Sequence, residues 1–479
     1  MPAPRRRSNM SHFQTPRVAV IGGGFTGAAF AAQLAGKARG PVAIDIVEPR
    51  TDLGRGVAYG TADPAHRINV PSTRMSVYPD QEDHFDRWLQ RQADVDADAA
   101  LPDGRVFPRR ELFGRYVGET LAAALAARPD IAFRHHRDRA LAIAEAGGTY
   151  RITLGSGDIV TADLIVLAAS HPPPAPPALL AALDGAPGYV ADPWAPAALA
   201  AIPPEAAVLI VGTGLTMADI VASLELQGHR GPITAVSRRG LLSRGHVARP
   251  VERFGQFTAP PSHSALHLLR RIRATVRAAA AEDQPWQAVL DAVRSDAQEI
   301  WQHLPLAEQG RLLRFLRPFW DVHRYRVAPQ AEAAIERARA AGRFRLVTGH
   351  LAAARPGIEL EVARGNGRLS LKGDALVVAT GPGHGSVIAT SPALQSLADA
   401  GLIAGDALGL GLATDRDDRA LDARGRPNAR LLVAGPLARA AWGELMGLPQ
   451  VSLHAARVAD HVAAWAATGT QRLAASASS

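Results

Sequence analysis

The chain contains no cysteine, and this absence excludes several classes of protein at once. Without thiols there can be no disulfide, no thiolate metal site, no cysteine nucleophile and no C-x-x-C redox pair. A flavoprotein disulfide reductase, whose chemistry passes through such a pair, is therefore ruled out. His135, His136 and His171 have no partners at metal-binding spacing, and we expect no metal.

Long apolar runs and basic stripes are also missing. The net charge of +8 is carried almost wholly by arginine, with Lys37 and Lys372 as the lysines. These arginines are scattered, which argues against a nucleic-acid partner. No apolar run reaches the roughly 20 residues of a membrane span. Residues 1–16 contain no apolar signal core, so we expect a disordered tail on a cytoplasmic protein. A homo-oligomer is left open.

A strand, a glycine turn and a helix near the start of the chain carry the strongest signal. Gly22, Gly24 and Gly27 have the spacing G-x-G-x-x-G after the apolar stretch 18–21. The first glycine allows the bend, the second lets the backbone approach a pyrophosphate, and the third lets helix and strand pack closely. About twenty residues further on, a second strand ends in Glu48, an acid suited to ribose hydroxyls. Together these features predict a dinucleotide site.

The same plan begins again in the middle of the chain. The apolar stretch 208–211 leads into Gly212 and Gly214, with Met217 in the place of the third glycine. The next strand ends in Ser237-Arg238-Arg239, and arginines attract a 2′-phosphate that an acid would repel. We predict NADPH here, with NADH or a solvated arginine pair as alternatives. The predicted contacts are Gly212, Thr213, Gly214, Leu215, Thr216, Ser237, Arg238 and Arg239.

The repeated plan predicts an α/β fold with two Rossmann-like dinucleotide-binding domains and a helical insertion. We expect one discontinuous domain over 17–200 and 375–479, and a second over 205–374 that includes the insertion 262–342. Within the insertion, the aromatic and charged segment 318–326 is either the wall of a substrate pocket or a packed helix end. Loops over 53–60 and 67–78, rich in glycine and proline, favour a functional role over a surface excursion.

These motifs together resemble a bacterial FAD/NAD(P)-binding family related to flavin-containing monooxygenases and amino-acid N-hydroxylases. The resemblance is carried by the segments Gly22–Gly27, Gly54–Tyr59, Arg67–Pro71, Gly212–Met217, Ser237–Gly240 and Val433–Leu437. The chain departs from the wider group at Pro436, where many relatives have an aspartate, and at 448–451, where a proline, an acid and a basic residue are expected. The signature Phe-x-Gly-x-x-x-His is not intact.

The resemblance implies FAD at the first turn and NADPH at the second. The residues it implies for FAD are Gly22, Gly24, Phe25, Thr26, Gly27, Glu48, Arg55, Gly435, Pro436 and Leu437. Asn69 and Met75 are candidates to lie near the flavin ring, and no catalytic residue is assigned. The implied reaction is hydride transfer from NADPH to FAD, followed by oxygenation of a small molecule with dioxygen. The alternatives are an NAD(P)H:acceptor reductase without oxygen insertion, and a nucleotide-binding sensor or assembly protein with little turnover.

Overall fold

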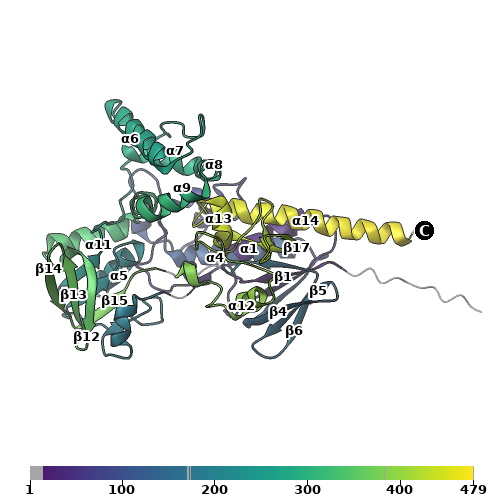
Figure 1. Ribbon diagram of the computed structural model, residues 1–479, viewed down its shortest axis with the longest axis horizontal. Coiled ribbons are helices and arrows are strands. Elements are labelled where there is room, and N and C mark those ends of the chain that lie inside the picture. Colours follow the sequence, from purple (N-terminus) through teal and green to yellow (C-terminus); the bar gives the residue numbers. More distant parts are fainter. Residues whose placement is uncertain (1–14, 170–171, 173, 382, 478–479) are drawn as a thin grey trace, which may run out of the picture.

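The computed structural model describes residues 15–169, 172, 174–381 and 383–477, and it contains two mainly parallel sheets (Figure 1). The predicted tail lies outside the described residues up to position 14. The two sheets are built on the two glycine turns, so the expected α/β class with two Rossmann-like units is confirmed. Among the described helices, none has the length and apolar character that a membrane crossing requires.

The first sheet has the strand order β16-β17-β7-β1-β2-β3. All neighbours are parallel except β16 and β17. Its strands are β1 (Arg17–Ile21), β2 (Ala43–Val47), β3 (Ala132–His136), β7 (Leu164–Leu167), β16 (Arg419–Leu421) and β17 (Pro427–Val433). Because successive side chains of a strand face opposite ways, Val18 and Val20 enter one core, and Ala19 and Ile21 enter the other.

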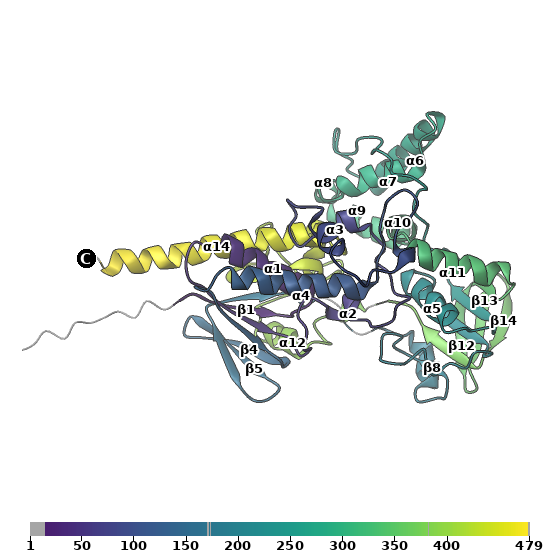
Figure 2. The same cartoon turned by 180° about the vertical axis from the view of Figure 1, so that it is seen from behind.

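Each core of the first sheet has its own cover. Helix α1 (Phe25–Lys37) packs on one face and contacts both α4 (Arg110–Ala126) and α14 (Gln450–Ala477), as Figure 2 shows from behind. The other face carries a small antiparallel sheet and α12 (Pro392–Asp399), which packs on β4. That sheet consists of β4 (Ala140–Ala146), β5 (Thr149–Leu154) and β6 (Ile159–Ala162).

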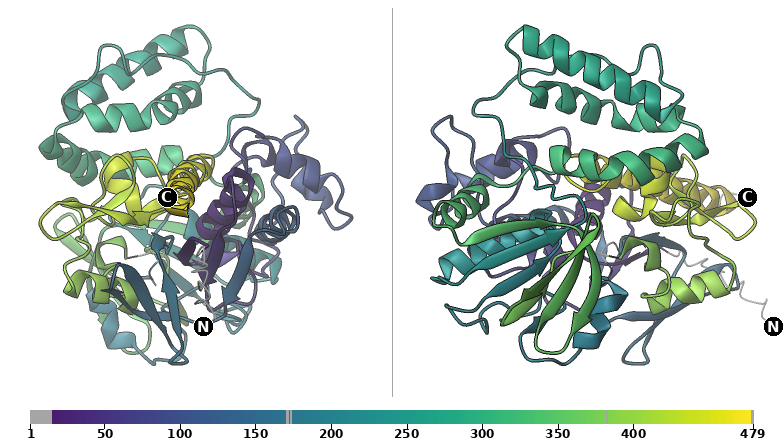
Figure 3. Two further views of the ribbon diagram at one scale, coloured as in Figure 1. Left: turned by 90° about the vertical axis from the view of Figure 1, so that its right-hand side faces the viewer. Right: turned by 60° about the vertical axis from the view of Figure 1, so that its left-hand side comes forward.

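The second sheet has the strand order β11-β10-β9-β15-β8 and is covered in the same way. Its strands are β8 (Tyr189–Val190), β9 (Val208–Val211), β10 (Ile233–Ser237), β11 (Phe344–Thr348) and β15 (Ala375–Val378). Helices α5 (Leu215–Leu226) and α11 (Pro329–Ala340) cover one face. The hairpin sheet β12 (His350–Arg355), β13 (Glu359–Arg364) and β14 (Gly367–Lys372) covers the other, in front in Figure 3 (right).

Three details of the predicted division are wrong. Strand β15 was expected in the first domain, but it pairs with β9 in the second sheet. Strand β8 lies before position 200 and also joins the second sheet, through β15. Helix α11 was expected in the insertion, yet its buried alanines pack on the second sheet beside α5. In each case a pairing partner distant in sequence decides where the segment lies.

The helical insertion proper stands apart from both sheets, at the top of Figure 1. It comprises α6 (Ala265–Ala281), α7 (Trp286–Ser295), α8 (Ala297–His303), α9 (Leu306–Arg311), a π-helical turn η4 (Leu312–Leu316) and α10 (Arg317–Arg324). It has a small core of its own. Short helices complete the rest: α2 (Gly56–Tyr59), α3 (His84–Leu89) and α13 (Arg439–Trp442).

A buried polar interface fixes the two sheets relative to each other. Arg110, at the start of α4, donates to both carboxylate oxygens of Asp219 on α5, at 3.0 and 2.8 Å. Beside this pair, the hydroxyl of Ser223 donates to Asp63 at 2.6 Å and its oxygen lies 3.2 Å from His66 Nε2. Burial lowers the pKa of His66, so the ring is held neutral in this interface.

Replacing Arg110 tests the importance of this interface. The side chains of Arg110 and Asp219 are 12% and 7% exposed, so Arg110→Ala leaves a buried carboxylate without its partner. We expect the free energy of unfolding to fall by about 3 kcal/mol in denaturant titrations. The control is Arg230→Ala, which breaks a pair with Glu205 whose side chains are 68% and 67% exposed, and should change stability by less than about 1 kcal/mol. Equal effects of the two variants would contradict the assignment.

Candidate functional site

The first glycine turn brings backbone into closer contact than any side chain would allow. A Cβ on Gly27 would lie 2.0 Å from the carbonyl oxygen of Gly22, which itself has a φ of +106°. Helix α1 begins at this turn with Gly24 as its N-cap, and no side chain caps it. The first N–H groups of a helix have no partner inside the helix. The turn therefore presents an uncapped, electropositive helix end, which is suited to an anion such as a pyrophosphate.

Glu48 lies at the end of β2, beside this turn. It is 5% exposed, and Oε2 accepts a hydrogen bond from the backbone N–H of Gly23 at 3.0 Å. Oε1 accepts from the backbone and side chain of Arg50, both at 3.1 Å. An ionised carboxylate offers about four acceptor positions, so capacity remains for a ribose hydroxyl. The carboxylate is thus fixed by the same turn that would bind the pyrophosphate.

The last-strand turn closes against the first one. Gly435 has a φ of +74°, and a Cβ there would lie 2.6 Å from Thr26 Oγ1. The Gly435 N–H donates to Nδ1 of His454 at 3.0 Å, and His454 Nε2 lies 3.0 Å from Asp418, which is fully buried. Because Nδ1 accepts, the proton of this ring is on Nε2 and is donated to Asp418. This network was not predicted, since its members lie 17 and 19 residues from Gly435 and share no motif.

Asp418 also organises the surroundings of that turn. Besides His454, it accepts hydrogen bonds from Trp442 Nε1 at 2.9 Å and from Arg457 Nε at 3.1 Å. These bonds connect the turn before β16, the segment after Gly435 and helix α14. The predicted residues Pro436 and Leu437 are buried in the short turn that this network holds. They stay predictions as FAD contacts.

The second turn repeats the first with one substitution. Gly212 has a φ of +111°, and a Cβ there would lie 2.3 Å from the carbonyl oxygen of Ala379. Helix α5 begins after Gly214 without a side-chain cap, and a Cβ on Gly214 would meet nothing within 4 Å. Met217, in place of the third glycine, is 1% exposed and packs in the core. Thr213 is held by a hydrogen bond to the carbonyl of Leu241 at 2.6 Å.

The arginines after β10 remain available to a ligand. Arg238 and Arg239 are exposed, and neither forms an ion pair with a described residue. The guanidinium of Arg239 lies 5.9 Å from the centre of the Phe319 ring, which belongs to the helical insertion. Ser237 Oγ accepts from the N–H of Gly240 at 3.1 Å and shapes the turn that carries both arginines.

The remaining predicted residues have different surroundings. Asn69 is half-buried, and its carbonyl accepts from His246 Nε2 at 3.1 Å. Burial lowers the pKa of His246 to about 4, so this ring is neutral at physiological pH. Met75 is 3% exposed and packs in the first core, which leaves its backbone as the part able to contact a ligand. Arg55 lies 3.3 Å from Asp52 in a partly exposed pair, and all three stay predictions.

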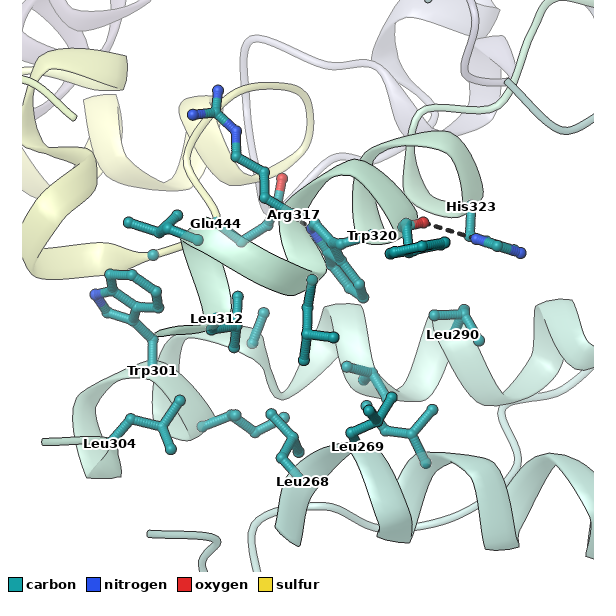
Figure 4. A pocket seen from close by; sticks show the side chains of 18 of the residues that line it. Leu268, Leu269, Leu290, Trp301, Leu304, Leu312, Arg317, Trp320, His323 and Glu444 are labelled. Carbon is teal, nitrogen blue, oxygen red and sulfur yellow. Dashed lines mark hydrogen bonds between the residues drawn. The ribbon is translucent and has the colours of Figure 1, made fainter. Parts of the chain in front are cut away.

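A cavity of about 490 Å³ lies between the helical insertion and the segment that follows the last-strand turn (Figure 4). Leucines of α6, α7 and the π-helical turn line it from the insertion, and Arg439, Gly443 and Glu444 line it from the other side. Phe319, Trp320 and His323 belong to the lining, so the segment 318–326 both packs as helix α10 and walls a pocket. Close contact again requires a glycine, because a Cβ on Gly443 would lie 2.6 Å from Trp301 Cγ.

Comparison with known proteins agrees with this geometry. Residues 19–172 match the model of a family described as FAD-NAD(P)-binding, so the first glycine turn lies in an FAD/NAD(P)-binding segment. No curated protein matches the chain. Similar solved structures include the reduced ornithine hydroxylase of Pseudomonas aeruginosa, with 14% identity, a TM-score of 0.60, and 95% and 100% of the two chains covered.

Two further structures extend the likeness. The L-lysine 6-monooxygenase of Pseudomonas syringae has 19% identity and a TM-score of 0.58, with 95% of this chain and 100% of that chain covered. The ornithine N-hydroxylase of Kutzneria sp. 744, described with reduced FAD, NADP⁺ and L-ornithine, has 15% identity and a TM-score of 0.56, with 94% and 99% covered. The chain therefore shares its fold with these hydroxylases and monooxygenases, which confirms the predicted resemblance in fold.

Two glycines of helix α1 provide a matched test of the first turn. Gly27→Ala places a methyl group against the Gly22 carbonyl, and we expect the free energy of unfolding to fall by about 1–3 kcal/mol. Gly36→Ala adds the same methyl where nothing lies within 4 Å, and should raise it by about 0.5–1 kcal/mol through helix propensity. Thermal and denaturant unfolding measure both. A Gly27→Ala protein as stable as the wild type would show that the turn is looser than described.

Proposed function

We propose that this chain is an FAD-dependent oxidoreductase that takes hydride from NADPH and uses dioxygen to oxygenate a small molecule. The observation that carries the proposal is the presence of two uncapped helix ends in one chain, one beside a buried acid and the other beside unpaired arginines. Each end suits the pyrophosphate of a different adenine dinucleotide.

The surroundings of the first turn fit FAD. Glu48 is held rigid by Gly23 and Arg50 and keeps acceptor capacity for ribose hydroxyls. A Cβ added to Gly24 would lie 3.4 Å from the Cα of Gly56. The loop 53–60 therefore lies next to the turn where we expect the pyrophosphate. The FAD-NAD(P)-binding description of the matching family supports this choice. So does the Kutzneria enzyme, which is described with reduced FAD and NADP⁺.

The surroundings of the second turn fit NADPH better than NADH. Arg238 and Arg239 follow β10 at the place where NAD-binding folds carry an acid for the 2′-hydroxyl. Neither has a carboxylate partner among the described residues, so both are available for a 2′-phosphate.

The roles left for the protein are binding, positioning and exclusion of water. When bound, FAD supplies the hydride acceptor and the reaction with dioxygen, so the chain needs no nucleophile of its own. His454 and Asp418 hold the Gly435 turn, and neutral His246 holds the backbone at Asn69. The apolar lining of the cavity offers water few hydrogen-bond partners beside the proposed sites.

The reaction of the NADPH-reduced protein with oxygenated buffer tests the oxygenation step. Stopped-flow absorbance should show reoxidation through a distinct, long-lived spectral phase, as expected when water is kept from the reacting ring. Rapid reoxidation without such a phase would contradict oxygenation and favour an NAD(P)H:acceptor reductase. Bound flavin that NADPH fails to reduce would favour a sensor or assembly protein.

Removing the two arginines tests the nucleotide assignment. In Arg238→Ala/Arg239→Ala, the loss of charged hydrogen bonds to a 2′-phosphate should raise the KM for NADPH about 10- to 100-fold and leave that for NADH nearly unchanged. Steady-state flavin reduction with each nucleotide gives both values. The control Arg345→Ala removes an exposed arginine from β11 of the same sheet and should change neither. An equal loss for NADPH and NADH would contradict the assignment.

A further inference from the structure

The cavity is built from segments that adjoin both glycine turns. Its wall includes Phe319, whose ring lies under the guanidinium of Arg239, beside the predicted NADPH site. Its opposite side includes Arg439, Gly443 and Glu444, which come shortly after the turn Gly435–Ala438. Gly435 of that turn lies close to Thr26. The cavity therefore lies close to both proposed nucleotide sites.

Most of the lining is apolar. Side chains from α6, α7 and the π-helical turn point into the space between these helices, as Figure 4 shows for Leu268, Leu269, Leu290 and Leu312. Such π-helical segments often occur at functional sites, and here the segment presents Leu312, Leu313 and Leu316 to the cavity. The cavity has a volume of about 490 Å³. This lining favours a hydrocarbon ligand over a strongly hydrated one.

One end of the cavity carries a buried cation that forms no ion pair with any residue the structure describes. Arg439 is 5% exposed, and its Nε donates to the carbonyl of Gly443 at 3.3 Å. Its two terminal nitrogens form no hydrogen bond or ion pair with any described residue. A buried guanidinium requires such partners, so these nitrogens are the natural place for an anionic ligand group.

The nearby acids also contact other cations. Glu444 accepts a hydrogen bond from Arg324 Nε at 2.9 Å and one from Trp320 Nε1 at 3.3 Å, and it forms an ion pair with Arg324 Nη2 at 2.7 Å, with both charged side chains at most 5% exposed. Asp321 lies 3.4 Å from Arg317 and also interacts electrostatically with Arg439, while burial, the larger influence, raises the pKa of its carboxyl. Arg294 on α7 donates to the carbonyl of Leu448 at 2.6 Å, and although burial lowers its pKa to about 9, it stays charged at neutral pH. The local balance is therefore positive.

We propose that this cavity is the substrate site and that it takes an apolar molecule with one carboxylate, whose head contacts Arg439 and whose hydrocarbon part lies among the leucines. That the ligand is a substrate rests on the proposed function, whereas its binding in the cavity does not. It also separates this chain from the neighbours named for ornithine and lysine. A diamino acid would bring an ammonium group into an apolar, positively charged site, where it would lose hydration without gaining a partner.

Calorimetric titration of the full chain, with its cofactors present, tests the ligand class. The probes are decanoate, 1-decanol, decylamine and L-ornithine. We expect decanoate to bind, 1-decanol to bind about 10- to 100-fold more weakly because it lacks the charged head, and the two amines to show no detectable binding. Ornithine or decylamine binding as tightly as decanoate, or no binding of decanoate, would overturn the proposal.

Two variants and a control locate the binding. Leu269→Trp fills the cavity and should abolish decanoate binding, whereas Leu266→Trp on the same helix changes a 56% exposed leucine outside the lining and should leave it intact. Arg439→Gln should weaken the binding of decanoate about 10- to 100-fold and change the affinity for 1-decanol by no more than about twofold. If Arg439→Gln does not fold, the comparison of Leu269→Trp with Leu266→Trp still tests the proposal. Decanoate binding that survives Leu269→Trp would overturn the proposal.

Flavin reduction by NADPH is measured separately on the wild-type protein and on Leu266→Trp, so the two proposals fail differently. Reduction without decanoate binding would overturn the ligand assignment and leave the proposed function standing. Decanoate binding that responds to Leu269→Trp, without reduction, would overturn the flavin chemistry and leave the cavity as a carboxylate site.

Discussion

The close backbone approach at the two glycine turns is the constraint on which the molecule depends. At the first turn, no side chain fits between Gly27 and the carbonyl of Gly22, and at the second none fits between Gly212 and Ala379. The first contact brings helix α1 directly to the end of β1, and the second brings the ends of β9 and β15 together. Helices α1 and α5, which follow these turns, both begin without a side-chain cap. An uncapped helix end is stabilised by an anion, so these two helix ends are the places that we propose for the two nucleotides.

Buried polar contacts then hold these sites in one arrangement. The pair Arg110–Asp219 joins the two sheets, and Asp418 with His454 holds the Gly435 turn against the first glycine turn. Removing one partner of such a pair leaves the other charge buried and uncompensated, and this strongly lowers the stability of the fold. The helical insertion contacts Arg239 through Phe319. It also faces the segment after Gly435, and the cavity lies between the two.

The sequence alone predicts what is local. Both glycine turns, the strands that precede them and the acid at Glu48 follow from periodicity and spacing, and the structure has them at the expected places. The segments that were misplaced, β15, β8 and α11, are defined by pairing with strands and helices far away in sequence. For the same reason Asp418, His454 and Arg439 were not found. A buried acid in a turn, a histidine on an apolar helix and one arginine among many carry no local signal of their partners.

The central claim is that one molecule holds FAD and NADPH at the same time, at separate turns. Equilibrium binding of both nucleotides to the purified chain, with the flavin followed by its visible absorbance and NADPH by its own, tests this most directly. The account predicts a yellow protein that retains one FAD per chain and binds one NADPH without releasing it. A colourless preparation that takes up neither added FAD nor NADPH, or one in which each nucleotide displaces the other, would contradict it.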